Sequence, residues 1–336
     1  MSDFSNYPED SAGSVMTFDF ISVECHMSAA EALEQIRKKA RGEEKLYTLY
    51  ITDKKHRLVG TAELQSLVFA EPKTAVRDIM KFSPICVKAS DDKEVAAELI
   101  SEYDLLSLAV VDAEKHLLGI ITAADALDLV SDAASEDISI MAAVTPSEKP
   151  YINASVFSIF RARIPWLLLL MLSATFTGMI ITKFESALAA LVSLTAFIPM
   201  LMGTGGNSGA QASVTVTRAL ELGELRVRDI FAVIRKELGI SLLCGAALGA
   251  ACFIKICLFD MMILGSEGVT ASVALAVSLT LFLTVISAKL VGAILPISAK
   301  KLGLDPALVA SPAITTVVDI ISLLLYFGIA KALLGI

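Results

Sequence analysis

The sequence predicts an α-helical membrane protein with five transmembrane helices, joined to a cytosolic α+β domain built from two tandem repeats. Three observations support this fold class. Residues 1–160 are rich in charged side chains, whereas residues 164–336 are almost entirely apolar. The apolar part contains stretches that reach the roughly 20 residues a helix needs to cross a bilayer. The polar part contains two similar segments, in which Asp53 corresponds to Asp112 and Gly60 to Gly119.

The polar part is predicted to fold as two repeats, over residues 15–75 and 76–138. The segment TLYITDKKHRLVGTAELQSLV (48–68) resembles SLAVVDAEKHLLGIITAADALDLV (107–130). Each repeat is interpreted as a strand, a helix, two short strands around a D-x-x-x-x-L-x-G turn, and a second helix. Two such units can pair their sheets and bury a shared core. Residues 1–14 are polar, lack the apolar core of a signal peptide, and are expected to form a disordered tail.

Five spans are expected in the apolar part, residues 163–336. Their approximate ranges are 164–182, 187–217, 238–260, 270–297 and 306–334. The second range is too long for one simple helix, and Pro199 with the glycine-rich run 203–209 is expected to break it. Non-helical backbone at membrane depth persists only where it is buried in protein or lines a water-filled cavity. The break is therefore a candidate pore element, with a kinked packing helix as the alternative. Residues 139–162 are expected to form a linker helix that enters this domain.

Asp319 is the only acid between Pro306 and Ile336. A carboxylate at the centre of a membrane helix costs roughly 2.5–3.5 kcal/mol on insertion scales, and it normally faces a wet cavity and marks an ion path. Ser311, Thr315 and Asp319 recur every fourth residue, so they share one helix face, with Ser322 close to it. The sequence therefore predicts a cation pathway along this face.

Basic residues near the ends of the spans predict the orientation of the chain. With the N-terminus inside, the inner side collects Arg161, Arg163, Arg218, Arg226, Arg228, Arg235, Lys236, Lys300 and Lys301. The outer side holds Lys183 and Lys255, with Lys331 near the C-terminus. This bias predicts a multi-pass plasma-membrane protein with cytosolic repeats and an external C-terminus. Lys289 lies inside the fourth span, where it either snorkels to the interface or pairs with an acid.

Composition argues against several classes of function. The formal net charge is −8 and the acids concentrate in the polar part. This balance argues against nucleic-acid binding, and it fits either a solvated helix face or a surface that attracts divalent cations. The five cysteines show no CxxC spacing, and the three histidines form no metal-ligand pattern. No Ser/His/Asp set, P-loop or HExxH motif occurs, so the chain is not expected to be an enzyme.

The repeat pattern resembles a tandem cystathionine-β-synthase (CBS) pair, which in general is a regulatory module. In that family, a Thr/Ser-x-x-Asp motif at the last helix often holds a nucleotide ribose. Thr122 and Asp125 match this motif in the second repeat, whereas the first repeat has Glu63 and Ser66 at the equivalent positions. The resemblance therefore implies at most one site for ATP.

The whole arrangement resembles the MgtE family of magnesium channels. Two motifs carry the resemblance: P-x-x-x-G-x-G-G-N-x-G-x-Q from Pro199 to Gln211, and D-P-A…P…T-x-x-D from Asp305 to Asp319. The resemblance covers about residues 15–336, and it implies a homodimer in the lipid bilayer with the pore on its two-fold axis. The implied pore positions are Asp319, Thr315, Ser311, Asn207, Gly205, Gly206 and Ala210. Ala210 departs from an asparagine in some relatives, so a side-chain contact is lost there.

The resemblance also implies regulation by Mg²⁺ bound to acids. The implied regulatory acids are Asp92, Glu94, Asp104, Asp125, Asp128, Glu136, Asp137 and Asp305. Without divalent ions these carboxylates repel one another. With Mg²⁺ they close, and the linker helix blocks the channel, a shift that needs only a few kcal/mol per bridging ion. Ala133 replaces a residue that is often acidic in relatives. The family's usual acidic helical domain before the CBS pair is expected to be missing, because only residues 1–14 precede the pair.

The leading hypothesis is a dimeric, Mg²⁺-selective uptake channel that cytosolic Mg²⁺ shuts. Mg²⁺ dehydrates reluctantly and keeps several waters, so a wide, oxygen-lined site suits it, although the same oxygen ligands also suit Ca²⁺ and Mn²⁺. Two alternatives remain open. One is an ion-coupled carrier that exchanges Mg²⁺ for H⁺ or Na⁺. The other is a non-transporting Mg²⁺ sensor.

Overall fold

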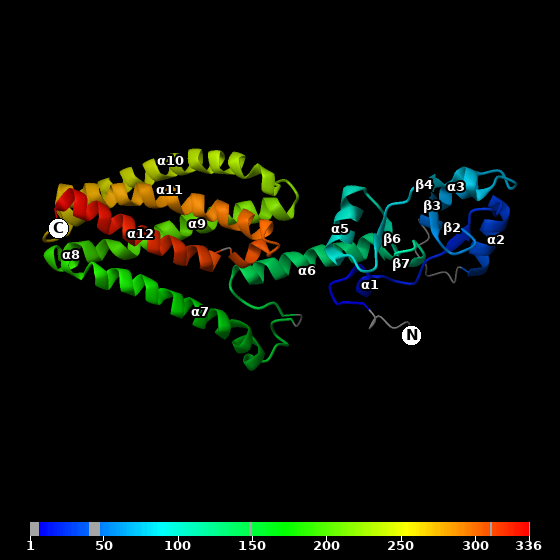
Figure 1. Ribbon diagram of the computed structural model, residues 1–336, viewed down its shortest axis with the longest axis horizontal. Helices are drawn as coiled ribbons and strands as arrows, with labels where there is room; N and C mark the ends of the chain where they lie inside the picture. Colours follow the sequence, from blue (N-terminus) through cyan, green and yellow to red (C-terminus); the bar gives the residue numbers. More distant parts are fainter. Residues whose placement is uncertain (1–6, 40–47, 148–149, 310, 336) are drawn as a thin grey trace. The chain divides into compact units, whose positions relative to one another are not determined.

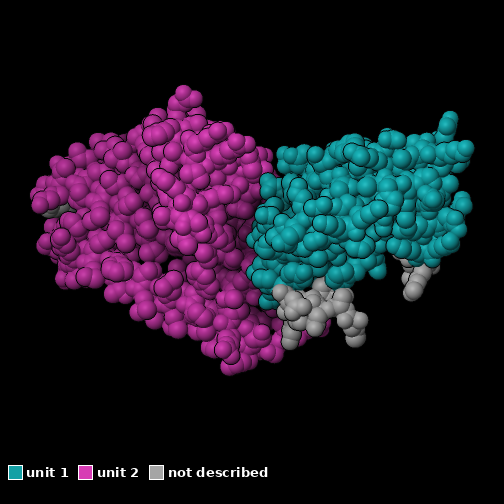
Figure 2. All heavy atoms as spheres, turned by 45° about the vertical axis from the view of Figure 1, so that its right-hand side comes forward, with its two compact units in different colours: residues 1–135 teal, residues 136–336 magenta. Residues whose placement is uncertain are grey.

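The computed structural model describes residues 7–39, 48–147, 150–309 and 311–335. The chain divides into two compact units, residues 1–135 (unit 1) and 136–336 (unit 2), which Figure 2 shows in separate colours. The boundary falls within one helix, α6 (Ala123–Met141).

The first repeat of unit 1 is a four-stranded sheet with helices beside it. Its elements are β1 (Ser22–Glu24), α2 (Ala29–Lys39), β2 (Thr48–Thr52), β3 (Leu58–Glu63), α3 (Leu64–Phe69), α4 (Val76–Ile79) and β4 (Lys81–Phe82). The strand order is β1-β2-β3-β4, in which β1 and β2 are parallel and the other neighbours antiparallel. The β4 strand lies beyond residue 75, yet it pairs with β3. Ala32, Ile51 and Leu67 meet in the core between sheet and helices.

The second repeat has the same order of elements. They are β5 (Cys86–Lys88), α5 (Lys93–Glu102), β6 (Ser107–Val111), β7 (Leu117–Thr122) and α6. The β5 and β6 strands are parallel, and β6 and β7 are antiparallel. The register shifts at Ile51/Thr52 in the first repeat and at Val110/Val111 in the second. The predicted order of strand, helix, two strands and helix is confirmed in both repeats.

The two repeats share a core, as predicted. The buried cluster that joins them contains Tyr50, Leu58, Ala109, Val111 and Ile120. The Tyr50 hydroxyl lies 2.6 Å from the Ser107 hydroxyl, and burial raises the pKa of Tyr50 to about 12. The turns of the two repeats also meet, because Leu58 N–H donates to the Lys115 carbonyl at 2.8 Å.

The predicted disordered tail is wrong for residues 7–14, and residues 1–6 lie outside the described part. Ser11 is only 3% exposed and Ala12 is fully buried. Ala12 begins the short helix α1 (Ala12–Val15) and its N–H donates to the Asp91 carbonyl at 2.7 Å. A side chain at Gly13 would lie 2.9 Å from the Ala89 carbonyl. Small residues at these positions therefore let the segment pack against the second repeat.

Helices make up unit 2 in the part of the chain that the structure describes. The α-helices from residue 156 onward are α7 (Val156–Lys183), α8 (Glu185–Ala190), α9 (Ile198–Glu221), α10 (Ile230–Lys255), α11 (Ala271–Lys301) and α12 (Ser311–Leu334). Short segments are the 3₁₀ helices η2 (Val192–Phe197), η3 (Val227–Asp229) and η5 (Pro306–Val309), and the π-helix η4 (Ile256–Ile263). Figure 1 shows α9 to α12 side by side, and α11 packs against each of the other three.

Four helical stretches are long and apolar enough to cross a membrane. They are Val156–Lys183, Val227–Ile263, Ala271–Lys301 and Pro306–Leu334. The most apolar window of α11 is 56% buried inside unit 2, whereas that of α7 is not buried at all, so α7 is peripheral. The second predicted span corresponds to α9, whose glycine, threonine and amide side chains lower its hydropathy. Four of the five predicted spans are therefore supported by length and composition, and the fifth stays a prediction.

The predicted break at residues 203–209 is wrong, because α9 is helical throughout this run. The irregular backbone comes earlier, at Leu191 and in η2. Pro199 lies at the start of α9, where its missing N–H needs no partner within the helix. The glycines remain helical because the bundle requires small residues there, as described below.

The predicted linker helix over residues 139–162 is also wrong as one helix. The α6 helix ends at Met141, and Ala143 adopts a φ of 55°. The α7 helix begins only at Val156, where the Ser155 hydroxyl accepts the Ser158 N–H as an N-cap. The sequence between them contains two prolines, which disfavour a continuous helix.

Candidate functional site

The glycine-rich run of α9 brings this helix very close to α11 and α12. A side chain added at Gly205 would lie 2.7 Å from Thr284 and 2.9 Å from Val318. One added at Gly209 would lie 2.7 Å from Ile314. Glycines four residues apart are a common way to bring membrane helices into contact. The run therefore serves helix packing, which explains why it is helical.

Asp319 lies half-buried on α12. Its carboxylate makes no hydrogen bond or ion pair with any residue that the structure describes, Lys289 included. Thr315 lies one turn earlier, and its side chain would be 3.1 Å from a side chain added at Gly206. The Thr315 hydroxyl donates to the Pro312 carbonyl at 2.9 Å. Asp319 and Thr315 therefore share a face that borders α9.

The other predicted pore positions fall into two groups. Asn207 is exposed and Ala210 half-buried, so both are accessible along α9. Gly205 and Gly206 are buried in the contact with α12. The side chain of Ser311 lies outside the described part. Ser322, which the spacing placed near the polar face, is fully buried and donates to the Val318 carbonyl at 2.6 Å, so it faces the bundle.

A cavity of about 830 Å³ adjoins α9 in unit 2. Asn207 and Ala210 contribute to its lining, together with Lys289 of α11 and Glu237 of α10. Glu237 was missed in the sequence because it directly follows Arg235 and Lys236 and directly precedes the third predicted span, 238–260. The structure instead buries it.

The predicted regulatory acids differ in how their oxygens are used. Asp92 caps α5 by accepting the Glu94 N–H at 2.8 Å. Asp305 accepts the Ala307 N–H at 2.7 Å. Besides these and Asp125, the predicted regulatory acids are Glu94, Asp104, Asp128, Glu136 and Asp137, of which the first four are exposed. The spacing of Asp125, Asp128 and Glu136 places these acids along one face of α6.

The possible nucleotide motif forms a helix cap. The Thr122 hydroxyl donates to Asp125 Oδ2 at 2.7 Å, and the Thr122 N–H donates to the same oxygen at 3.0 Å. The Asp125 N–H donates a hydrogen bond to the Thr122 hydroxyl oxygen at 3.3 Å. This reciprocal arrangement satisfies donors at the start of α6.

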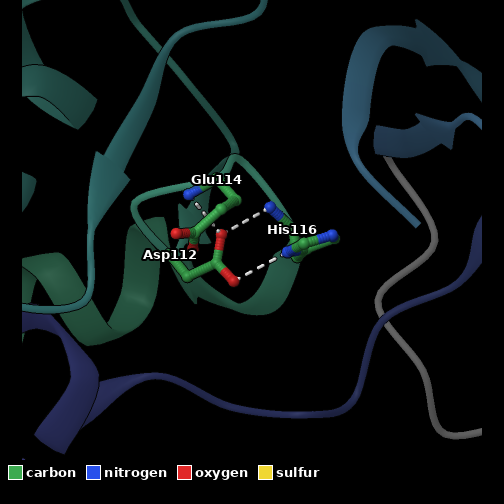
Figure 3. A group of neighbouring side chains, drawn as sticks. All are labelled: Asp112, Glu114 and His116. Atoms are coloured by element: carbon green, nitrogen blue, oxygen red, sulfur yellow. Dashed lines mark hydrogen bonds and ion pairs between the residues drawn. The ribbon is translucent and has the colours of Figure 1, made fainter. Parts of the chain in front are cut away.

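A second group of possible metal ligands consists of Asp112, Glu114 and His116, whose ligand atoms lie within 4.8 Å of one another. Figure 3 shows that Asp112 is already engaged: Oδ1 accepts the Glu114 and His116 N–H groups, and Oδ2 lies 2.8 Å from His116 Nδ1. Partial burial opposes ionisation, but the bonds from His116 hold the pKa of Asp112 below its usual value. This geometry indicates a turn rather than a metal centre.

The first repeat has the same turn at Asp53. Its Oδ1 accepts the Lys55 and Arg57 N–H groups at 2.8 and 3.0 Å, and its Oδ2 pairs with the Arg57 guanidinium at 2.7 Å. The backbone bond from Arg57 is the largest cause that lowers the pKa of Asp53 to about 2. The equivalent use of both aspartates accounts for the sequence repeat.

The basic ends of α9 and α11 meet within unit 2. Lys300 Nζ donates to the Leu220 carbonyl at 2.9 Å. Lys255, assigned to the opposite side, pairs with Asp260 at 2.7 Å. Residues 218–220 of α9 and residue 300 of α11 therefore lie at the same end of the helical bundle.

Comparisons with known proteins agree with these features. The family model described as "Divalent cation transporter" (MgtE) matches residues 198–329, and the CBS domain model matches residues 76–132. The chain is 37% identical to the magnesium transporter MgtE of Thermus thermophilus, over 98% of this chain and 71% of that protein. It is 36% identical to magnesium transporter MgtE of Bacillus subtilis, over 97% of this chain and 70% of that protein.

Two solved structures are also similar. One is the soluble part of a magnesium transporter, with a TM-score of 0.38, 32% identity, and coverage of 39% of this chain and 52% of that chain. The other is the cytosolic domain of the Mg²⁺ channel MgtE in complex with ATP, with a TM-score of 0.36, 38% identity, and coverage of 38% and 51%. This chain spans about half the length of each.

Helices long and apolar enough to cross a membrane, the match to the divalent cation transporter model and the match to the CBS domain together define a membrane transporter of divalent cations. The chain belongs to the MgtE family of magnesium transporters.

Proposed function

We propose that the protein is a homodimeric channel that conducts Mg²⁺ into the cell, with its pore on the two-fold axis beside α9 and α12. The observation that carries this proposal is Asp319, an unpaired and half-buried carboxylate in an apolar helix. A charge in this position is costly unless it faces water or a partner. A second copy of the chain would place an equivalent carboxylate opposite and enclose water between the two.

The chemistry of the site suits a hydrated cation. Mg²⁺ keeps several waters, and carboxylates can accept hydrogen bonds from them without displacing the shell. Thr315 and Asn207 would add oxygens beside Asp319, and Ser311 would stand nearer the cytoplasmic mouth. Gly205 and Gly206 would hold α9 against α12 beside the ion path, and the small, half-buried Ala210 would leave room for the hydrated ion. The same oxygen donors admit Mn²⁺ or Ca²⁺, so selectivity would rest on cavity size and rigidity.

Cytosolic Mg²⁺ would regulate the channel through the acids of the CBS pair and α6. Asp125, Asp128 and Glu136 carry like charges on one helix face, which destabilise each other at this spacing. Bound Mg²⁺ would remove this repulsion and favour the closed state. Each ion would need to supply only a few kcal/mol of preference for that state. The chain between α6 and α7 would then follow the movement of the acids.

The orientation follows from the basic residues. Arg218 and Lys300 belong to the positive set that the bias places inside, and Lys183 to the smaller set outside. This places the CBS pair in the cytosol and the C-terminus outside, in a plasma membrane. Five spans, including α9, satisfy this arrangement.

ATP would bind at Thr122 and Asp125 of the second repeat. The two side chains already bond each other at the start of α6, and this carboxylate and hydroxyl are the groups that would hold a ribose. A relative's cytosolic domain is known in complex with ATP. Binding would then compete with the use of Asp125 as a helix cap.

Mg²⁺ flux into proteoliposomes tests the pore. We expect Asp319→Ala to reduce the flux to the level of empty vesicles while the dimer stays folded, because the pore loses its only carboxylate on α12. Lys331→Ala, at the exposed end of the same helix, is the matched control and should conduct normally. Undiminished flux in Asp319→Ala would remove the basis of this proposal.

The same preparation separates the alternatives. A channel conducts without a proton or sodium gradient and gives single-channel steps. Flux that requires such a gradient would instead identify an ion-coupled carrier. Divalent binding by calorimetry with no flux in any condition would identify a sensor.

A further inference from the structure

Two opposite charges are buried in unit 2 without touching. Glu237 on α10 is 7% exposed and Lys289 on α11 is 6% exposed. Both line the cavity of about 830 Å³ beside α9. Glu237 Oε2 has no hydrogen-bond partner, and neither side chain forms an ion pair within 4.0 Å in the described part of the chain.

Such charges need a polar surrounding. An ionised group in a dry interior is strongly unfavourable, and a direct pair offsets the cost only with good geometry. Here the geometry leaves a gap, and the gap is lined by the polar side chains of Asn207, Gln211 and Thr215. A cavity of this size with several polar partners can hold ordered water. The two charges therefore act on each other, and on any ion, through a wet space.

The cavity adjoins the predicted ion path. Asn207 and Ala210, two of the predicted pore positions, form part of its wall. The contact between α9 and α11 fixes the position of Lys289 along the axis of the bundle, because a side chain at Gly209 would lie 3.2 Å from the Ala288 carbonyl. Lys289 thus stands beside the glycine-rich run that also borders α12.

We propose that Glu237 and Lys289 form an electrically neutral vestibule for a hydrated divalent cation, in which Lys289 limits how tightly Glu237 holds the ion. This proposal rests on the proposed channel function. Conduction requires a site that is favourable enough to enter and weak enough to leave. Glu237 and the amide and hydroxyl oxygens attract the cation, and the fixed ammonium of Lys289 offsets that attraction.

The two single neutralisations should shift transport in opposite directions. Lys289→Met leaves a net negative vestibule, so the Mg²⁺ concentration for half-maximal flux should fall by about three- to tenfold, and the maximal flux should fall as the ion leaves more slowly. Glu237→Gln leaves a net positive vestibule, so the half-maximal concentration should rise by about the same factor. Both are measured in proteoliposomes with a Mg²⁺-sensitive dye.

Two further variants serve as controls. Lys289→Arg keeps the charge and should retain the half-maximal concentration within about twofold. The double variant Lys289→Met with Glu237→Gln restores neutrality and should return toward the wild-type value, a non-additivity that is expected for interacting groups. Where Lys289→Met is not recovered folded, Lys289→Gln replaces it. Glu237→Gln carries the test on its own if neither is recovered.

Shifts in the same direction for the two singles would overturn the vestibule, because a merely structural pair weakens transport whichever partner is lost. No shift in a folded Glu237→Gln variant would overturn it as well. These results are separate from the pore test. If Asp319→Ala abolishes flux while the Glu237 and Lys289 variants behave as structural losses, only the vestibule fails. If Asp319→Ala conducts normally, the proposed function itself fails.

Discussion

Two groups of carboxylates, one in each unit of this protein, are used differently. In unit 1, Asp53, Asp112 and Asp125 direct their oxygens to backbone N–H groups of turns and helix ends. In unit 2, Asp319 and Glu237 have carboxylate oxygens with no partner in the described residues. Acids that are bonded to the backbone hold a fold together. Acids left unbonded in an apolar surrounding retain free oxygens for an ion.

The largest expected effect comes from Asp319→Asn, which keeps the shape and removes the charge. We expect Mg²⁺ flux to fall at least about 100-fold, in line with several kcal/mol of lost electrostatic attraction. The melting temperature in detergent should stay unchanged or rise, because Asp319 bonds to no described residue. Asp112→Asn is the counterpart in unit 1 and should conduct normally. Equal flux in the two variants would erase the distinction between the units.

A smaller effect is expected from the unbonded acids of α6. Asp128 and Glu136 are exposed and have no partner among the described residues. When the Mg²⁺ concentration on the CBS side of the vesicle membrane is low, the double variant Asp128→Asn with Glu136→Gln should conduct as the wild type does. When that concentration is high, the flux through the double variant should be several-fold larger than the flux through the wild type. The reason is that fewer regulatory ions stabilise the closed state. Identical inhibition curves for the double variant and the wild type would exclude these two acids from regulation.

Asp125→Ala should affect stability more than flux. It removes the acceptor of two bonds at the start of α6, and loss of an N-terminal cap costs about 1 kcal/mol. Thermal unfolding followed by circular dichroism measures the loss. Ala124→Ser, at an exposed neighbouring position, is the control. A variant with unchanged stability would show that the cap contributes nothing.

The smallest expected effect is the loss of folding stability at acidic pH. The pKa of Asp53 is lowered to about 2 in the folded protein, whereas an unfolded aspartate titrates near 3.9. A depressed pKa contributes stability that is present above the unfolded value and is lost as pH falls through the folded value. Wild-type protein should therefore lose stability between about pH 4 and pH 2 more steeply than Asp53→Asn. Parallel pH profiles of the two proteins would contradict this assignment.

The sequence was sufficient for features that depend on local pattern. The turns at Asp53 and Asp112 could be recognised as a repeat from the sequence. Each aspartate accepts two backbone N–H groups, and this role requires the same residue type at the same spacing. Asp319 was conspicuous because one acid in a long apolar run has few structural explanations. The family motifs around Asn207 and Asp319 were equally readable.

Features that depend on tertiary packing were not predictable from the sequence. Glycines favour breaks by local propensity, so the run at Gly205 and Gly209 was predicted as irregular, yet close contact with α11 and α12 keeps it helical. Ser11 and Ala12 were placed in a tail because their burial comes from a distant loop. Glu237 carried no sign of its burial, because only the packed bundle brings it to the cavity.

The glycine contacts of α9 constrain how an aperture beside it can widen. At Gly209 and Gly292 the backbones of α9 and α11 lie in direct contact, whereas Gly205 packs against the side chains of Thr284 and Val318. Sliding or rolling α9 against α11 would drive main chain into main chain. Any widening beside α9 is therefore expected to move α9 and α11 together, with the change of shape taken up by the 3₁₀ segments η2 and η5.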